Sequence, residues 1–497
     1  MATSYVLAID QGTSSTKAIL FDEHGGVVKR ASATLNTVYL AQGWVEQDPL
    51  AILDSVREAC SKCLEGIPSK TVKCIGISNQ RETFILWDKK GNPVHPAIVW
   101  SCKRSAQICE HLKDQEAWLS KKTGLVVDPY FSGTKLLWLV QHNPQIADQM
   151  AKGELYFGTV DTWLLYHLTN GACYYTDHSN ASRTLFFNLE DLDWDRDILH
   201  KWQLGQLQLP EIKASSDDFG ETDVFGLLST PAPITAMIGD SHAAMFGETC
   251  FAQGDIKMTL GTGSSLLMHI GPRPLASKNG LLTTIGWSTK DEVAYAWEGA
   301  IVACGAMVEW LKSVNIITNV KETAALAQSI NEVSDVYVIP AFSGLGAPFW
   351  QMNQKASFHG ITFGTTKAHL VKATLESIGY QIKAVVDAMQ ADLQRPIPRM
   401  AMHGGLANNT FVQTCLNALL DGKITIQDNL DISAQGAAFL AGLKSGIFKD
   451  RASLKELLKL QTLPKDETDN HILTQYNAWL ELLHAVPRSG KAKRAKM

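Results

Sequence analysis

Two stretches of this chain share one pattern: Leu7-Ala8-Ile9-Asp10-Gln11-Gly12-Thr13-Ser14-Ser15 near the start and Met258-Thr259-Leu260-Gly261-Thr262-Gly263-Ser264-Ser265 near the middle. Each is an apolar run and a turn of glycine and small hydroxyl residues, followed by a second apolar run at 17–21 or 266–270. This pattern predicts a hairpin of two largely buried strands. A turn without bulky side chains exposes backbone N–H groups and hydroxyls that can hold a phosphate. The repeat therefore predicts a nucleotide held between two related halves.

The length of the chain also indicates two units. A chain of 497 residues exceeds the roughly 250–300 residues at which single hydrophobic cores stop growing. Turn signals gather between Asp191 and Pro233, and we place the boundary near residue 247, which gives domains at 1–247 and 248–497. Short apolar runs alternate with amphipathic helix patterns in both halves, which predicts an α/β fold.

Polar clusters follow three of the predicted strands. The strands and their clusters are 72–78 with 79–82, 97–100 with 101–104, and 234–238 with 239–242. Ligands of open α/β sheets bind beyond the carboxyl ends of the strands. We therefore expect the three clusters to face one cavity.

Composition excludes several classes of function. A net charge of −5 and a pI near 6.3 give no electrostatic case for nucleic acid. No apolar run reaches the roughly 18 residues of a membrane span, and the chain enters a strand pattern at Tyr5 without a leader signature. The nine cysteines are an odd number spread along the chain. We expect a cytoplasmic protein with reduced thiols.

Cys60 and Cys63 have the spacing of a redox pair. They also lie on the apolar face of a helix pattern that begins at Asp48-Pro49, and this favours two buried helix cysteines. The basic tail, 488–497, lacks apolar anchors, and we expect a solvated end.

The chain contains neither a Walker loop nor a G-x-G-x-x-G fingerprint, so phosphate must be held in another way. The first glycine loop is followed, in order, by Gly43-Trp44-Val45-Glu46, Asn79-Gln80-Arg81-Glu82-Thr83, Ile98-Val99-Trp100, the stretch from Asp128 to Lys135, Gly158-Thr159-Val160-Asp161-Thr162-Trp163, Asn180-Ala181-Ser182-Arg183-Thr184 and the stretch from Phe342 to Pro348. This series resembles the glycerol kinase branch of the FGGY carbohydrate kinases, which belong to the actin-like ATPase superfamily. The resemblance implies a ribonuclease H-like fold, with duplicated α/β domains around a central cleft.

The resemblance implies that Asp240 is the base near the reacting hydroxyl and that Asp10 organises Mg²⁺ through water beside the phosphates of ATP. Both roles suit the chemistry, because phosphoryl transfer relies on positioning, on charge neutralisation and on a carboxylate that accepts the proton of the alcohol. The alternative is that both aspartates are helix caps or turn residues.

For the nucleotide, the resemblance points to both glycine loops and to three later segments. The implied residues are Thr13, Ser14, Ser15, Lys17, Thr262, Gly305, Glu309, Gly405, Asn408 and Asn409. Lys17 replaces the arginine that is usual in the family, and so loses the bidentate fork. The loop before Asn408 is one residue shorter than usual, which leaves the choice between Asn408 and Asn409 open.

For the polyol, Arg81, Glu82, Trp100 and Tyr130 match the family's set. Arg can donate to hydroxyls, Glu can accept from them, and the rings cover the C–H faces of the carbon chain. The alternative for Arg81 and Glu82 is a structural ion pair with each other.

Two further polyol positions depart from the family. Ser241 stands where Gln usually follows the base, and Ser265 stands where Phe usually packs on the carbon chain. The smaller side chains leave space for a longer polyol such as erythritol, threitol, xylitol or ribitol. The alternative is that a neighbouring ring, such as Trp287 or Trp297, fills that space and glycerol remains the substrate.

The sequence thus predicts an ATP- and Mg²⁺-dependent kinase that converts glycerol to glycerol 3-phosphate, with a longer polyol as the alternative substrate. ATP is expected mainly on the second half and the polyol mainly on the first. A non-enzymatic alternative is an actin-like, nucleotide-binding sugar sensor. The family's habits imply a homodimer or homotetramer.

Overall fold

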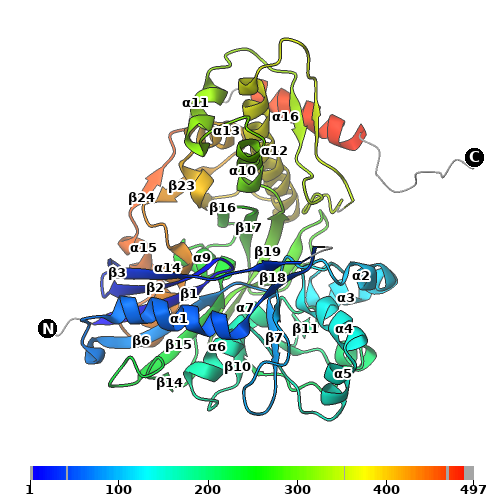
Figure 1. The fold of residues 1–497 in the computed structure, drawn as a ribbon. Coiled ribbons are helices and arrows are strands. Elements are labelled where there is room, and N and C mark those ends of the chain that lie inside the picture. Colours follow the sequence, from blue (N-terminus) through cyan, green and yellow to red (C-terminus); the bar gives the residue numbers. More distant parts are fainter. Residues whose placement is uncertain (1–3, 41–42, 352, 466–469, 486–497) are drawn as a thin grey trace, which may run out of the picture.

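Two large β-sheets, one from each half of the chain, have matching strand orders in the computed structural model, which describes residues 4–40, 43–351, 353–465 and 470–485 (Figure 1). The first sheet runs β3 (Val27–Thr34), β2 (Ser15–Asp22), β1 (Tyr5–Gln11), β6 (Val72–Asn79), β15 (Ala232–Gly239), β14 (Glu221–Thr222). The second runs β18 (Leu282–Thr289), β19 (Glu292–Ile301), β17 (Ser264–Gly271), β16 (Ile256–Leu260), β22 (Arg399–His403), β23 (Lys423–Gln427), β24 (Leu460–Thr462). The strands of the first sheet correspond in order to β19, β17, β16, β22, β23 and β24 of the second sheet. The basic tail at 488–497 lies outside the described residues.

The two predicted hairpins are confirmed. β1 pairs antiparallel with β2 and parallel with β6, while β16 pairs antiparallel with β17 and parallel with β22. In both sheets the next parallel neighbour, β15 or β23, leads into a helix. The two glycine loops, at 12–14 and 261–263, therefore occupy equivalent places in the two sheets.

The first hairpin is buried because helices cover both faces of its sheet. Val6 to Ile9 and Ala18 to Phe21 have no exposed surface, and α1 (Pro49–Leu64) and α14 (Ile432–Lys444) both pack on these strands. α1 begins as predicted, with Asp48 capping a proline-led first turn. Cys60 and Cys63 are buried and unpaired, and burial raises the pKa of the Cys63 thiol to about 11. The prediction of two buried helix cysteines is confirmed.

A pair of helices joins the two sheets at their centre (Figure 1). α9 (Asp240–Gly247) follows β15, and α14 follows β23, so the two helices are equivalent elements of the two halves. They cross at glycines: a Cβ on Gly436 would lie 1.8 Å from the carbonyl oxygen of Ala243, and one on Gly247 would lie 2.5 Å from that of Ile432. The backbones of the two helices are therefore in direct contact.

We expect Gly436→Ala to destabilise the protein by about 1–3 kcal/mol, because the new methyl group meets backbone rather than a movable side chain. Gly205→Ala is the matched control, since a Cβ there meets nothing within 4 Å. Differential scanning calorimetry measures both variants. Equal melting temperatures for the two would contradict the close crossing of α9 and α14.

A third sheet lies beside the first and corrects one expectation. It runs β4 (Val38–Tyr39), β5 (Val45–Gln47), β8 (Ala97–Ile98), β7 (Phe84–Trp87), β9 (Tyr156–Thr159). The strand predicted at 97–100 is only Ala97–Ile98 and belongs to this separate sheet. Arg104, from the polar cluster after it, donates to Glu46 at 2.6 Å and lies over the ring of Trp44. The expectation that all three polar clusters face one cavity is therefore wrong for this cluster.

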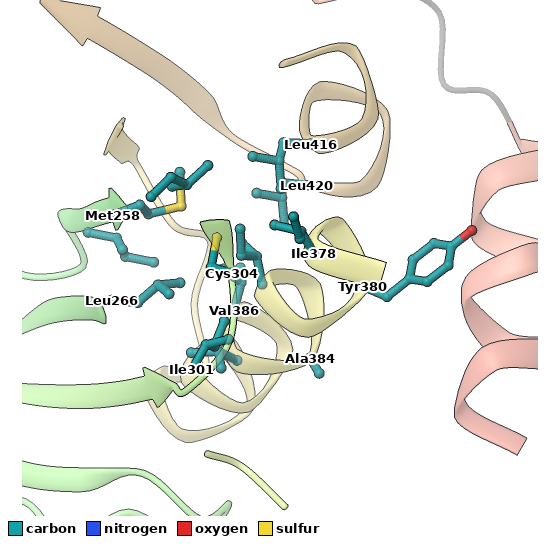
Figure 2. Close-up of a cluster of buried hydrophobic side chains, with 14 of the residues drawn as sticks. Met258, Leu266, Ile301, Cys304, Ile378, Tyr380, Ala384, Val386, Leu416 and Leu420 are labelled. Carbon is teal, nitrogen blue, oxygen red and sulfur yellow. The ribbon is translucent and has the colours of Figure 1, made fainter. Parts of the chain in front are cut away.

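The hydrophobic core of the second half holds the strands on either side of the second glycine loop (Figure 2). Met258, Leu266 and Ile301, from three neighbouring strands, lie on one side of it. Ile378 and Val386 of α12 (Lys367–Leu393) lie on the other, with α13 (Thr410–Leu419) beyond them. The strands that carry the loop are thus held by packing on α12.

Other elements complete the fold. The other helices are α2 (Ala106–His111), α3 (Glu116–Thr123), α4 (Ser132–His142), α5 (Pro144–Ala151), α6 (Val160–Leu168), α7 (His178–Ala181), α8 (Arg196–Lys201), α10 (Gly305–Ser313), α11 (Thr323–Gln328), α15 (Arg451–Leu457) and α16 (Asn470–Ala485). The remaining strand pairs are β10 (Tyr175–Asp177) with β13 (Glu211–Lys213), β11 (Phe187–Asn188) with β12 (Asp193–Trp194), and β20 (Tyr337–Ile339) with β21 (Ser357–His359). Among the described residues, no helix has the length and apolar character needed to span a membrane.

Candidate active site

Asp240 stands at the carboxyl end of β15, where it is the first residue of α9. Its side chain is 41% exposed, and its Oδ1 lies 3.2 Å from Nε of Arg81, whose side chain is only 6% exposed. Arg81 follows β6, the parallel neighbour of β15. Two of the three predicted polar clusters are thus brought together at one edge of the sheet, and Asp240 remains accessible to a ligand.

Behind Asp240 lies a network of buried charges. Arg81 Nη1 is 3.0 Å from Oε1 of Glu298, and Arg183 Nη1 is 2.6 Å from Oε2 of the same carboxylate. Arg183 also donates from Nε to Glu82 at 2.6 Å. Arg81 and Glu82 therefore pair with other residues rather than with each other.

Glu298 and Arg183, to which the sequence pattern gave no role, have no exposed surface. Although burial opposes ionisation, Arg183 and Arg81 hold the pKa of Glu298 well below its usual range. Glu82 has a φ of 60°, a left-handed conformation that costs a non-glycine residue energy and that recurs at functional sites. The network fixes the orientation of Arg81 and Glu82.

Two predicted aromatic residues lie beside this network. The rings of Trp100 and Tyr130 meet edge-on with centroids 5.7 Å apart. Trp100 Nε1 donates to the hydroxyl of Thr13 at 2.9 Å, which ties the aromatic pair to the first glycine loop. The ring of Tyr130 lies 5.9 Å from the guanidinium of Arg183.

Ser241 and Ser265 lie together, with their hydroxyl oxygens 3.0 Å apart. Ser265 donates to Glu298 at 3.1 Å, and the buried Lys257 donates to the Ser241 hydroxyl and, at 3.1 Å, to the carbonyl of Ser265. Burial, reinforced by Arg81, lowers the pKa of Lys257 to about 7.

Trp287 and Trp297, the two rings expected to fill the space beside Ser241 and Ser265, lie against other residues. Trp287 packs on Phe246 and Phe251, and Trp297 donates to the carbonyl of Leu275 at 2.6 Å. Neither ring contacts the two serines in any interaction of the described residues. The expectation that Trp287 or Trp297 fills the space is wrong, because polar groups surround the serines instead.

Asp10 stands at the start of the first glycine loop. Ser78 donates to Asp10 Oδ1, and desolvation raises the pKa of the Asp10 carboxyl to about 6 despite that hydrogen bond and the nearby Lys17. Ser14 is exposed at the tip of the loop and Ser15 begins β2. A desolvated carboxylate suits a hard divalent cation that also takes water and phosphate oxygens. Within the described residues, no group of three or more His, Cys, Asp or Glu side chains is placed to hold a metal ion.

Lys17 reaches across to the second half of the chain. Its Nζ lies 2.9 Å from Oδ1 of Asp431, the residue before α14, and Arg30 lies 3.4 Å from the other oxygen of that carboxylate. The Lys17 side chain is 41% exposed. It therefore remains open to a phosphate on its free side.

The predicted nucleotide residues of the second half lie in the second glycine loop, on α10 and in the segment after β22. The N–H of Gly305 donates to the carbonyl of Gly261 at 2.9 Å, and Thr262 is exposed at the loop tip. Gly405 and Asn408 are exposed in the segment after β22, and Glu309 is exposed on α10.

The choice between the two asparagines is clearer in the structure. Asn409 accepts from the N–H of Val412 as the N-cap of α13 and donates to Thr323 at 3.0 Å. Asn408 is exposed. Asn409 is thus engaged within the protein, and Asn408 is the more exposed of the two.

Comparison with known proteins identifies the family. The N-terminal domain model of the FGGY family of carbohydrate kinases matches residues 5–247, and its C-terminal domain model matches residues 256–445. The chain belongs to the FGGY family of carbohydrate kinases. It is 44% identical to glycerol kinase 2 of Thermotoga maritima over 92% of this chain and 93% of that protein. It is 40% identical to the glycerol kinase of Fusobacterium nucleatum over 98% and 99%.

Solved structures of kinases share the fold of this chain. A crystal structure of Plasmodium falciparum glycerol kinase with ADP matches this FGGY kinase with a TM-score of 0.89 at 33% identity, over 97% of this chain and 98% of that one. A gluconate kinase from Lactobacillus acidophilus shares the fold with a TM-score of 0.88 at 20% identity, over 99% and 100%. The predicted duplicated, actin-like α/β fold is confirmed, and the protein is a kinase.

Proposed function

We propose that this kinase transfers the terminal phosphoryl group of ATP to a terminal hydroxyl of glycerol. The observation that carries the proposal is the accessible carboxylate of Asp240 held beside Arg81 and the Trp100–Tyr130 pair. The extensive identity to glycerol kinases supports the same substrate.

Each residue of this site has a role that follows from its chemistry. Arg81 donates to, and Glu82 accepts from, adjacent hydroxyls, while Trp100 and Tyr130 cover the carbon chain. Asp240 accepts the proton of the attacking hydroxyl as its oxygen bonds to the terminal phosphorus. The bond from that phosphorus to the bridging oxygen breaks, and ADP leaves with the electron pair.

The nucleotide is proposed to lie between the two glycine loops. Thr13, Ser14, Ser15 and Lys17 would face its phosphates from the first half, and a second set from the other half: Thr262, Gly305, Glu309, Gly405 and Asn408. Asp10 would hold Mg²⁺ through water, and the ion supplies charge neutralisation at the phosphate oxygens.

We place the domain boundary near residue 247 and propose that the halves close to exclude water before transfer. Free, mostly buried cysteines suit the cytoplasm. A homodimer or homotetramer, as the family resemblance implies, is tested by light scattering.

A panel of purified-enzyme assays tests the substrate. We expect at least tenfold higher kcat/KM for glycerol than for erythritol, threitol, xylitol or ribitol, a difference of about 1.4 kcal/mol. The hydroxyls of Ser241 and Ser265 favour the longer polyols as the second candidate, because each can hydrogen-bond a further polyol hydroxyl where the family usually has Gln or Phe. Preference for a longer chain would replace glycerol, and ATP binding without turnover on any polyol would favour the sensor.

A further inference from the structure

Lys257 is a fully buried lysine that lies between the proposed polyol and nucleotide sites. It projects from β16, four residues before Gly261, and has no exposed surface. In its ammonium form it has three N–H donors, and three acceptors surround it: the hydroxyls of Ser241 and Thr259 and the carbonyl of Ser265. Every donor of the ammonium is thus used inside the protein.

A first chain of hydrogen bonds runs from Lys257 to the polyol side. Lys257 donates to Ser241, the Ser241 and Ser265 hydroxyls are 3.0 Å apart, and Ser265 donates to Glu298 at 3.1 Å. An ammonium can only donate and a carboxylate can only accept. The hydroxyl of Ser241 must therefore donate towards Ser265 or towards a ligand. Glu298 in turn holds Arg81.

A second chain runs from Lys257 to the nucleotide side. Lys257 donates to Thr259 at 3.2 Å, the Thr259 hydroxyl lies 2.8 Å from Nε2 of His403, and His403 Nδ1 lies 3.1 Å from Glu248. With Nδ1–H donating to the buried Glu248, Nε2 accepts from Thr259, so every group in the chain is satisfied. His403 is followed directly by the Gly404-Gly405 turn.

The turn after His403 is closely packed against the second glycine loop. Gly404 has a φ of 105°, and a Cβ there would lie 2.6 Å from the carbonyl oxygen of Leu260. A shift of His403 therefore moves the backbone on which Gly405 and Asn408 are carried. The two chains share Lys257 as their common donor, and they end on two different buried carboxylates.

We propose that Lys257, acting through Thr259 and His403, is a positioning residue that couples occupancy of the polyol site to the conformation of the nucleotide loop. The inference rests on the proposed function, because it takes glycerol and ATP as the two ligands. A polyol hydroxyl that accepts from Ser241 takes the proton that Ser241 would otherwise donate to Ser265. This alters the hydrogen bonds of the first chain next to Lys257. Because both chains begin at one ammonium, the change reaches the Thr259–His403 bond.

The test measures the coupling factor between the two ligands. Isothermal titration calorimetry gives the Kd of glycerol with and without a saturating, non-hydrolysable ATP analogue and Mg²⁺, and the reverse titration must give the same factor. We expect the wild-type protein to show a factor of about 5 or more. Thr259→Val keeps the shape of the side chain and removes its hydroxyl. It should bring the factor close to one while the Kd of glycerol alone changes less than about threefold.

Three further variants sharpen the test. Thr259→Ser restores the hydroxyl and should restore the coupling. His403→Asn removes the acceptor from the other side of the same bond and should lower the factor as far as Thr259→Val does. Thr425→Val is the matched control, because Thr425 is a buried threonine on β23 of the same sheet whose hydroxyl has no hydrogen-bond partner. It should leave the factor unchanged.

The outcomes separate this inference from the proposed function. A wild-type protein that binds both ligands independently, a Thr259→Val variant with wild-type coupling, or equal losses in Thr259→Val and Thr425→Val would each overturn the role of Lys257 and leave glycerol phosphorylation standing. A folded wild-type protein that binds no glycerol, with or without nucleotide, would overturn both.

Discussion

Asp240→Asn is expected to lose polyol-dependent ADP formation by about 10³-fold or more, while the Kd of ATP changes less than about threefold. The amide keeps the size of the carboxylate and cannot accept the proton of the alcohol. The second glycine loop and the residues around it do not include Asp240, so nucleotide binding should survive. The loss should therefore fall on kcat rather than on the affinity for ATP.

Asp421→Asn is the control for this experiment. It makes the same chemical change at a side chain that is 91% exposed and lies 3.8 Å from Lys465. A coupled assay of ADP release, with nucleotide binding measured by fluorescence, distinguishes the two variants. If Asp240→Asn kept activity within about tenfold of the wild type, another group would have to accept the proton.

Glu298→Gln should cost both stability and polyol binding. Removing one partner of a buried ion pair typically costs about 3–5 kcal/mol, and here two arginines, Arg81 and Arg183, lose the same carboxylate. Arg81 contacts the carboxylates of Glu298 and Asp240. The variant would therefore remove the buried partner that holds Arg81 in place beside Asp240. We expect a lower melting temperature and a Kd for glycerol raised by at least about tenfold.

Glu292→Gln is the matched control, because Glu292 begins the same strand and forms a partly exposed ion pair with Arg451 at 2.7 Å. Such a pair contributes about 1 kcal/mol or less. Thermal unfolding and glycerol titration are measured on both variants. Similar losses in the two would show that the buried network does not hold Arg81.

The parts of the structure that follow from local pattern could be predicted. The two glycine hairpins, the capped helix at Pro49 and the strands before Asn79 and Gly239 depend on periodicity and turn chemistry over short stretches. The contact of Arg81 with Asp240 follows as well, because β6 and β15 are parallel neighbours and their carboxyl ends meet.

The buried partners of the site could not be predicted in the same way. Lys257 and Glu298 lie within largely apolar strands, and their contacts depend on which strands pair and in which register. The sequence did contain one signal of these partners: a single charged residue within an apolar strand must pair with another buried group. The error over Trp297 has the same origin: neighbours in a strand face opposite ways, so Trp297 points away from the site that Glu298 faces.

The central claim is that Asp240 receives the proton of the polyol hydroxyl that takes the phosphoryl group. A crystal structure with glycerol and a non-hydrolysable ATP analogue tests it directly. We predict an Asp240 carboxylate oxygen about 2.6–3.2 Å from a terminal glycerol oxygen, with that oxygen aligned on the terminal phosphorus. A closed complex in which no glycerol oxygen comes within hydrogen-bond reach of Asp240 would contradict it.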